Sequence, residues 1–145
     1  MPTATRSVTV DRPIGRVADF LSDFASTAEW DPHTVSCRRL DDGPLGVGAR
    51  YENVQRLAGR ESTLIYEVTE YEPGRRVVLH GGNDTVSSRD EMTFAEAGDG
   101  RTTVTYTIDL HLLGAAKLGE LLVPVIMKKV ADDGEDGMRE RLLKL

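Results

Sequence analysis

Long apolar runs are absent from this chain of 145 residues, which contains a single cysteine, Cys37, and a single tryptophan, Trp30. One cysteine cannot form an internal disulfide, and we interpret Cys37 as a plain strand residue. No stretch approaches the roughly 20 apolar residues that span a bilayer. The first residues also lack the apolar core of a signal peptide. We therefore expect a cytoplasmic protein without stable membrane insertion.

Positive charge is in deficit, since the formal net charge is −6. Duplex nucleic acid is a poor partner for such a chain, because phosphate binding needs a basic face. Anionic membranes are disfavoured for the same reason. The short basic pairs Arg38-Arg39 and Lys128-Lys129 are interpreted as solvated surface. We expect a small-molecule partner, no nucleic-acid partner, and either a monomer or a homodimer.

Motifs of known catalytic sites are missing as well. The sequence has no Gly-rich phosphate loop and no G-x-S-x-G, C-x-x-C or H-E-x-x-H motif. Asp31 and His33 are conceivable metal ligands, but no further ligand lies nearby in the sequence, so a capping Asp and an exposed His are preferred. We predict no metal and no cofactor, and the catalytic residues, if any, stay unknown.

The N-terminal part of the chain predicts one strand and two short helices. Residues 5–10 alternate with Val8 and Val10 on one face, as in a strand. Pro13 suits the first turn of a helix, and apolar residues then repeat at helical spacing. A second short helix is expected over 25–30, ended by the Asp31-Pro32 pair.

From residue 35 onward the hydrophobic period changes to two, which is typical of strands. The breaks between these segments are short and rich in Gly, Asp and Pro, so neighbouring strands are expected to pair antiparallel as a meander. The predicted strands are 35–40, 49–57, 61–71, 75–81, 86–95 and 102–112.

The last segment predicts a long amphipathic helix. Pro124 cannot sit in a regular helix interior, so we place it in the first turn of the main helix, with 115–122 as a separate turn or short helix. Gly134 and Gly137 each cost about 1 kcal/mol relative to Ala, which indicates close packing or a flexible region. The residues thus predict an α+β domain whose helix packs on one antiparallel sheet.

Four segments, taken together, resemble one known superfamily; they are 8–23, 29–32, 43–51 and 67–76. Their order and spacing are similar to those of the START-like, Bet v 1-like (SRPBCC) superfamily, which includes the polyketide cyclase/dehydrase proteins. The resemblance implies a single START-like domain over 1–145. It also implies the helix-grip fold, in which a curved seven-stranded antiparallel sheet wraps around a long C-terminal helix. Two short helices follow the first strand, and a cavity lies between sheet and helix.

A cavity site in such a fold would be built from side chains that face inward. Polar groups there are costly unless paired, so they either orient a ligand or bond one another. The segment 118–127 is expected to line the cavity and its gate or to form a subunit interface. Trp30 matches a W-x-P pattern near the cavity entrance of the family, although a core anchor is equally consistent. The ligand-binding candidates are Trp30, Tyr51, Asn53, Tyr66, His80, Asp90, Met92, Phe94, Tyr106, Ile108, Val123, Ile126, Met127 and Val130.

The function predicted from the resemblance is the binding of a small hydrophobic ligand, such as a lipid, an isoprenoid or a polyketide-like compound. The alternative is a polyketide aromatase/cyclase or dehydratase that uses the same cavity, with acid–base groups among Tyr51, His80, Arg89 and Asp90. A ribosome-associated interaction protein is a third hypothesis, which the acidic charge fits poorly. No residue pattern matches a defined cyclase motif, so the prediction leans toward binding without catalysis.

Overall fold

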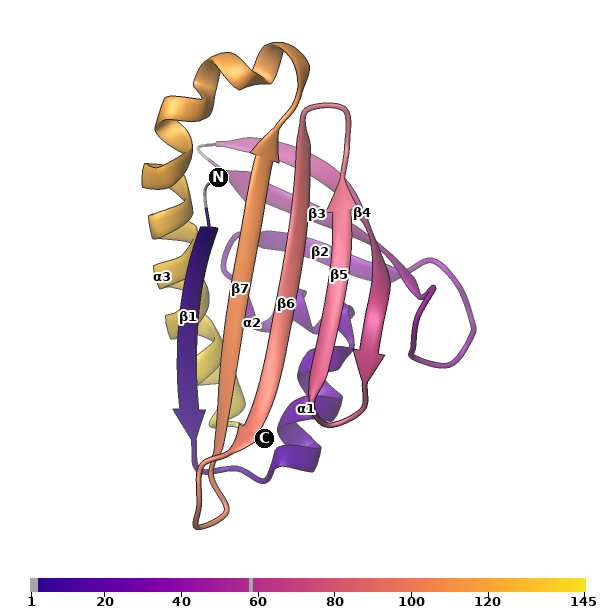
Figure 1. Cartoon of the computed structure of the whole chain (residues 1–145), viewed down its shortest axis with the longest axis vertical. Helices are drawn as coiled ribbons and strands as arrows, with labels where there is room; N and C mark the ends of the chain where they lie inside the picture. The colour runs from indigo at the N-terminus through magenta and orange to yellow at the C-terminus, as the bar shows by residue number, and fades with distance from the viewer. Residues whose placement is uncertain (1–2, 58) are drawn as a thin grey trace.

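Seven strands form one antiparallel sheet in the order β1-β7-β6-β5-β4-β3-β2 (Figure 1). The structure is a computed structural model that describes residues 3–57 and 59–145. The first two strands of the chain, β1 and β2, lie at the two edges of the sheet, and the strands between them form a meander. The strands are β1 (Thr3–Val10), β2 (Thr34–Arg39), β3 (Arg50–Leu57), β4 (Arg60–Glu72), β5 (Arg76–Gly82), β6 (Val86–Glu96) and β7 (Thr102–Leu112).

Short helices follow β1, and a long one ends the chain, as the sequence predicts. The helices are α1 (Ile14–Ser22), the 3₁₀ turn η1 (Phe24–Ser26), α2 (Thr27–Trp30), the 3₁₀ helix η2 (Gly114–Leu122) and α3 (Val123–Leu142). Pro124 lies in the first turn of α3, where its missing N–H costs no helical hydrogen bond. The predicted break before the main helix is therefore confirmed.

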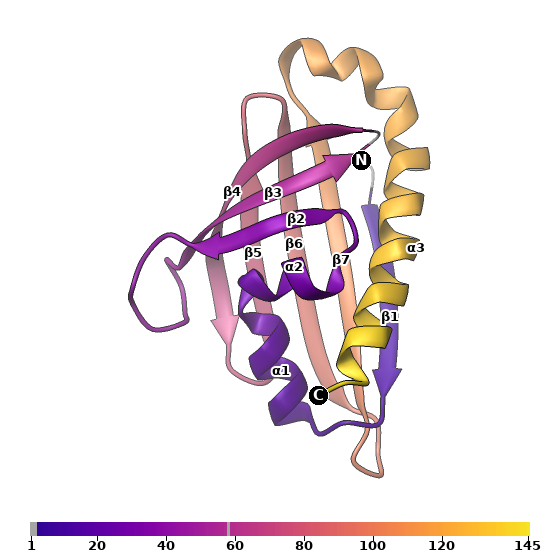
Figure 2. The same cartoon turned by 180° about the vertical axis from the view of Figure 1, so that it is seen from behind.

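The sheet curls so that β2, β3 and β4 cross over the strands behind them (Figure 2). Its inner and outer faces are set by the strand alternation that the sequence shows. In β6, for example, Ser88, Asp90 and Met92 are buried, whereas Arg89 and Glu91 turn outward. The helix-grip fold expected from the resemblance is confirmed, because α3 lies along the open side of this curled sheet.

An ion pair, a histidine–carboxylate contact and close packing hold α3 against the two edges of the sheet. Arg6 on β1 pairs with Asp132 on α3 at 2.9 Å. On the other side, His33 Nε2 lies 2.8 Å from Asp133 Oδ2. A Cβ on Gly137 would lie 2.0 Å from the Trp30 carbonyl oxygen, so α3 approaches the C-terminal end of α2 as closely as a glycine permits. The sequence analysis expected either close packing or a flexible region at Gly137, and the structure shows close packing.

The interior is filled at one end of the sheet and hollow at the other. At the filled end, α1 and η1 pack beneath β3, β4 and β6, and Phe24 lies 4.7 Å from Tyr66, measured between ring centroids. Met92 and Phe94 belong to this core. The hollow end lies toward η2, where β6 begins and β7 ends. None of the described helices is long and apolar enough to cross a membrane.

Candidate ligand-binding cavity

A cavity of about 380 Å³ lies between the sheet and the helices η2 and α3. This volume is in the range of small-molecule sites. Its walls come from β3, β4, β6 and β7 on one side and from α2, η2 and α3 on the other. The cavity thus occupies the place between sheet and C-terminal helix in which the sequence resemblance predicts one.

Most of the cavity wall is apolar. The sheet contributes Leu64, Ile108 and Leu110, and α3 contributes Ile126 and Val130. Because alternate residues of a strand share a face, Ile108 and Leu110 both point inward while Asp109 and His111 point away. The apolar stripe of α3, which includes Ile126 and Val130, forms the opposite side of the cavity.

A polar cluster in the cavity wall centres on Asp90, which is only 3% exposed. Ser88 Oγ donates a hydrogen bond to Asp90 Oδ1 at 2.6 Å, and the Tyr106 hydroxyl donates to Oδ2. Burial raises the pKa of Asp90 to about 6, and the two hydrogen bonds oppose this rise because they favour the charged form. Asp90 therefore changes charge close to neutral pH.

Tyr66 adds a second phenol to the same region. Its side chain is fully buried, and burial, followed by the nearby charge of Asp90, holds its pKa well above the usual range. The pKa of Tyr106 is raised for the same two reasons. Both phenols therefore stay neutral and can donate hydrogen bonds.

Asp31, directly after α2, brings a second carboxylate to the cavity wall. Its Oδ1 accepts the backbone N–H of His33 at 3.0 Å, and its Oδ2 accepts the Thr34 hydroxyl at 2.8 Å. Burial raises its pKa, and these hydrogen bonds again work in the opposite direction. The negative charge of Asp31 is also one of the causes that raise the pKa of Asp90.

Asn53 lines the cavity from β3 and is 1% exposed. Its Nδ2 donates to Thr27 Oγ1 at 3.2 Å. Its Oδ1 is buried and has no hydrogen-bond partner among the residues that the structure describes. A buried acceptor without a donor is costly, and such a group in a native structure calls for an explanation.

The structure brings nine of the predicted site residues together around this cavity. They come from four strands and one helix, and they include both the polar cluster and the apolar wall. They are Asn53, Tyr66, Asp90, Tyr106, Ile108, Val123, Ile126, Met127 and Val130.

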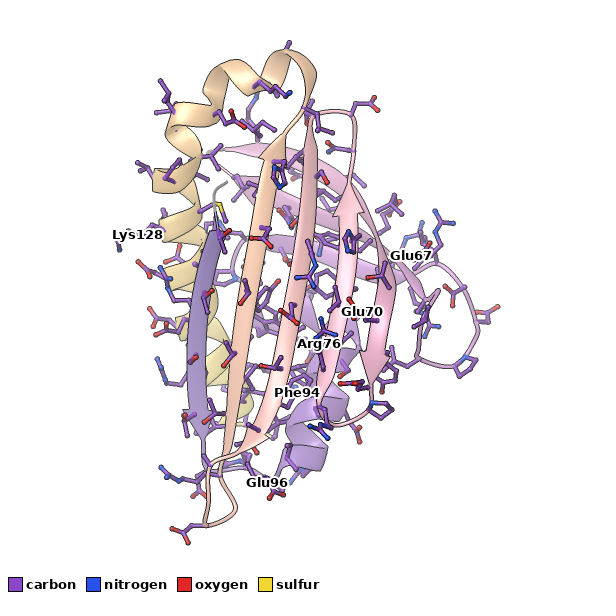
Figure 3. All side chains as sticks on the ribbon, in the orientation of Figure 1. Glu67, Glu70, Arg76, Phe94, Glu96 and Lys128 are labelled. Carbon is purple, nitrogen blue, oxygen red and sulfur yellow. The ribbon has the colours of Figure 1, made fainter. Side chains whose placement is uncertain are left out.

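His80 does not face the cavity, contrary to the expectation from its sequence pattern. Its side chain is exposed on the outer face of β5, between Glu67 on β4 and Arg89 on β6. The outer face of the sheet is charged, as Figure 3 shows for Glu67, Glu70 and Arg76. Arg76 pairs there with Glu70 at 2.6 Å. A half-polar imidazole is better solvated on this face than in an apolar wall.

Tyr51, Met92 and Phe94 point inward but belong to the filled core, not to the cavity wall. The Tyr51 hydroxyl donates to Asp23 Oδ1 at 3.0 Å, and this hydrogen bond connects the N-cap residue of η1 to β3. Met92 and Phe94 lie on the same face as Asp90, but the helices α1 and η1 cover them. The structure therefore corrects the expectation that these three side chains line the cavity.

Trp30 also lies outside the main cavity and acts as a core anchor. Its ring packs edge-on against Tyr106, with centroids 5.6 Å apart, and lies beside Gly134 of α3. Its Nε1 donates to Ser26 Oγ at 3.3 Å. Of the two interpretations that the sequence left open for Trp30, the structure favours the anchor.

The sequence analysis did not predict several residues of the cavity wall, including Ser88, Leu110 and Asp31. Ser88 and Leu110 were detectable, because each lies two residues from a predicted wall residue on the same strand. Asp31 had no such signal, since it follows a helix and not a strand.

Among the described residues, no three His, Cys, Asp or Glu side chains come close enough to hold a metal.

Comparisons with known proteins agree with this architecture. Residues 1–143 match the model of the family described as polyketide cyclase/dehydrase and lipid transport. No curated protein sequence matches the chain. Among solved structures, a Thermus thermophilus protein superposes with a TM-score of 0.82 at 19% identity, covering 99% of this chain and 98% of the other.

Two further solved structures share the fold. A START superfamily protein of Mycobacterium smegmatis has a TM-score of 0.79 at 14% identity, with 98% of this chain and 97% of the other covered. The Zhui aromatase/cyclase of Streptomyces sp. R1128 has a TM-score of 0.77 at 18% identity, with 98% and 91% covered. Such identities show a common fold, and the family match covers nearly the whole sequence. The chain therefore belongs to the polyketide cyclase/dehydrase and lipid-transport family.

Proposed function

We propose that this protein binds a small, mainly apolar molecule in the cavity between the sheet and α3. The observation that carries the proposal is the cavity itself, about 380 Å³ in volume, with an apolar wall and one polar cluster. Apolar burial contributes about 25 cal/mol per Å² of surface removed from water, so the wall supplies affinity. The polar cluster around Asp90 orients the ligand, because buried polar groups bind partners selectively.

The ligand class that suits this wall is a lipid, an isoprenoid or a polyketide-like compound. The description of the family covers both lipid transport and polyketide conversion, and it is compatible with each. Native mass spectrometry of gently purified protein, followed by extraction of any bound molecule, identifies which class the protein retains. A defined adduct that contains one ligand per chain is the expected result.

A fluorescence titration tests binding without knowledge of the natural ligand. The neutral apolar dye N-phenyl-1-naphthylamine should bind saturably with one site per chain. The variant Leu110→Trp places a larger ring in the cavity and should weaken binding strongly, whereas His111→Trp, on the opposite face of β7, should keep it. Binding that survives Leu110→Trp unchanged would place the dye elsewhere and contradict the proposal.

A second candidate function is a polyketide cyclase or dehydratase reaction in the same cavity. The observation that favours it is the Asp90–Tyr106 pair, since a carboxyl group with a pKa of about 6 is suited to accept and return a proton near neutral pH. Under this hypothesis Asp90→Asn abolishes turnover of a poly-β-keto thioester while dye binding survives. Equal turnover of wild type and variant would exclude Asp90 as the acid–base group.

A further inference from the structure

We propose that the cavity selects ligands whose polar end is a protonated amine, and that it discriminates against carboxylates and phosphates. This inference rests on the proposed binding function and names the chemical class of the ligand. It follows from the charges, the unused acceptors and the missing counter-ions of the cavity wall.

The charge of the cavity wall has one sign. Asp31 and Asp90 both line the cavity, and no Lys, Arg or His lines it within residues 3–57 and 59–145. The cationic side chains of the chain lie elsewhere, for instance Lys128, which projects outward from α3 (Figure 3). A ligand with a carboxylate or phosphate would bring further negative charge to a desolvated site that has two carboxyl groups and no cation to offset them.

Neither cavity carboxylate forms a salt bridge with a residue that the structure describes. In the described part of the chain, other acidic groups form ion pairs, such as Asp132 with Arg6 and Glu91 with Arg76, but Asp31 and Asp90 form none. His33 lies beside Asp31 and is a lesser cause that lowers the pKa of Asp31, but its Nε2 is directed to Asp133 on α3. Buried carboxylates without a partner are destabilising, so a pair of them beside an apolar cavity points to a cation that comes with the ligand.

The hydrogen-bond count leads to the same ligand chemistry. Each oxygen of Asp31 and Asp90 accepts a single hydrogen bond from the described residues, whereas a carboxylate offers about four acceptor sites. Asn53 Oδ1, on the same cavity, is a buried acceptor without a donor in the described part of the chain. An ammonium group carries three donors, no acceptor and one positive charge. It matches this wall better than a hydroxyl group, which donates once and carries no charge.

Three ligands with the same eight-carbon chain test the inference by isothermal titration calorimetry at neutral pH. They are octylamine, 1-octanol and octanoate, and they differ only in the polar end. Because a hydrogen bond to a charged group contributes about 1.5–3 kcal/mol, octylamine should bind roughly ten- to a hundredfold more tightly than 1-octanol. Octanoate should bind most weakly of the three.

Variants assign the preference to the two carboxylates. Asp90→Asn and Asp31→Asn should each lower the ratio of amine to alcohol affinity several-fold. Glu67→Gln removes one charge from the outer face of β4, next to the inward-facing Tyr66, and should leave the ratio unchanged. This control matters because an acidic protein attracts amines weakly everywhere on its surface. Leu110→Trp narrows the cavity and should weaken the binding of all three ligands.

The outcomes separate this inference from the proposed function. Binding of 1-octanol or octanoate as tight as that of octylamine overturns the amine preference and leaves the binding function intact. An amine preference that is the same in wild type, Asp31→Asn and Asp90→Asn also overturns it. If none of the three ligands binds saturably, both proposals fail. The ligand series on the wild-type protein is decisive even where a variant does not fold.

Discussion

Asp90→Asn should change how the stability of the ligand-free protein depends on pH. The pKa of Asp90 is raised from 3.8 to about 6 in the folded state, mainly by burial. Between these two values the folded protein holds a proton that the unfolded chain has released. Folding stability therefore falls as the pH rises through this window, and the loss is complete above about pH 6.

The magnitude follows from the size of the shift. A rise of about two pKa units at about 1.4 kcal/mol per unit gives roughly 3 kcal/mol that the ionised Asp90 costs at neutral pH. An Asn at this position cannot ionise, so the variant lacks this cost. Its amide oxygen still accepts from Ser88 or Tyr106, but its N–H groups need acceptors, and this offsets part of the gain.

Urea unfolding of wild type, Asp90→Asn and the outer-face control Glu67→Gln at several pH values between 4 and 8 measures this effect. The difference in unfolding free energy between Asp90→Asn and wild type should grow by about 2–3 kcal/mol in favour of the variant from pH 4 to pH 7. Glu67→Gln should not show this growth. Parallel profiles for wild type and Asp90→Asn would refute the account of Asp90 as a buried, costly charge.

Three glycine substitutions test the packing of the interior, and a fourth substitution tests an ion-pair cluster on the outer face of the sheet. Gly81→Ala places a Cβ 2.4 Å from the Tyr66 ring and should destabilise the fold by about 1–3 kcal/mol in urea denaturation. The control Gly15→Ala lies on α1 with open space around it, and in the same assay it should be neutral or stabilising by up to about 1 kcal/mol. Gly137→Ala meets the backbone of Trp30 and should cost more than Gly81→Ala, because a carbonyl oxygen yields less than a side chain. Arg76→Ala breaks the partly exposed ion pairs with Glu70 and Glu91 and should cost about 1 kcal/mol, with a loss that shrinks at high salt.

The strands were predictable to within a residue or two, because apolar and polar residues alternate and the turns carry Gly, Asp and Pro. The start of α3 was predictable from Pro124 alone. The orientation of His80 was not, because β5 buries Val77, Val78 and Leu79 in succession and the pairing of β4 with β5 shifts register between Val68 and Glu70. A bulge of this kind breaks the two-residue period on which an inside–outside prediction depends.

The sequence also did not predict which inward-facing residues belong to the filled core and which line the cavity. Ser88, Asp90, Met92 and Phe94 alternate regularly along β6, so periodicity places all four on the inner face. Whether such a residue meets a ligand depends on which helix lies over it. The helix α1 and the turn η1 cover the Phe94 end, and the other end stays open beneath η2 and α3. This is a property of tertiary packing and leaves no trace in a single strand.

Methyl NMR during a titration with 1-octanol tests the central claim most directly, namely that the cavity is the ligand site. The account predicts saturable shifts of the methyl groups of Ile108, Leu110 and Val130, which line the cavity. The methyl groups of Leu121 and Val125, which are exposed on the outside of η2 and α3, should not shift. Shifts confined to Leu121 and Val125 would show surface binding instead and would contradict the account.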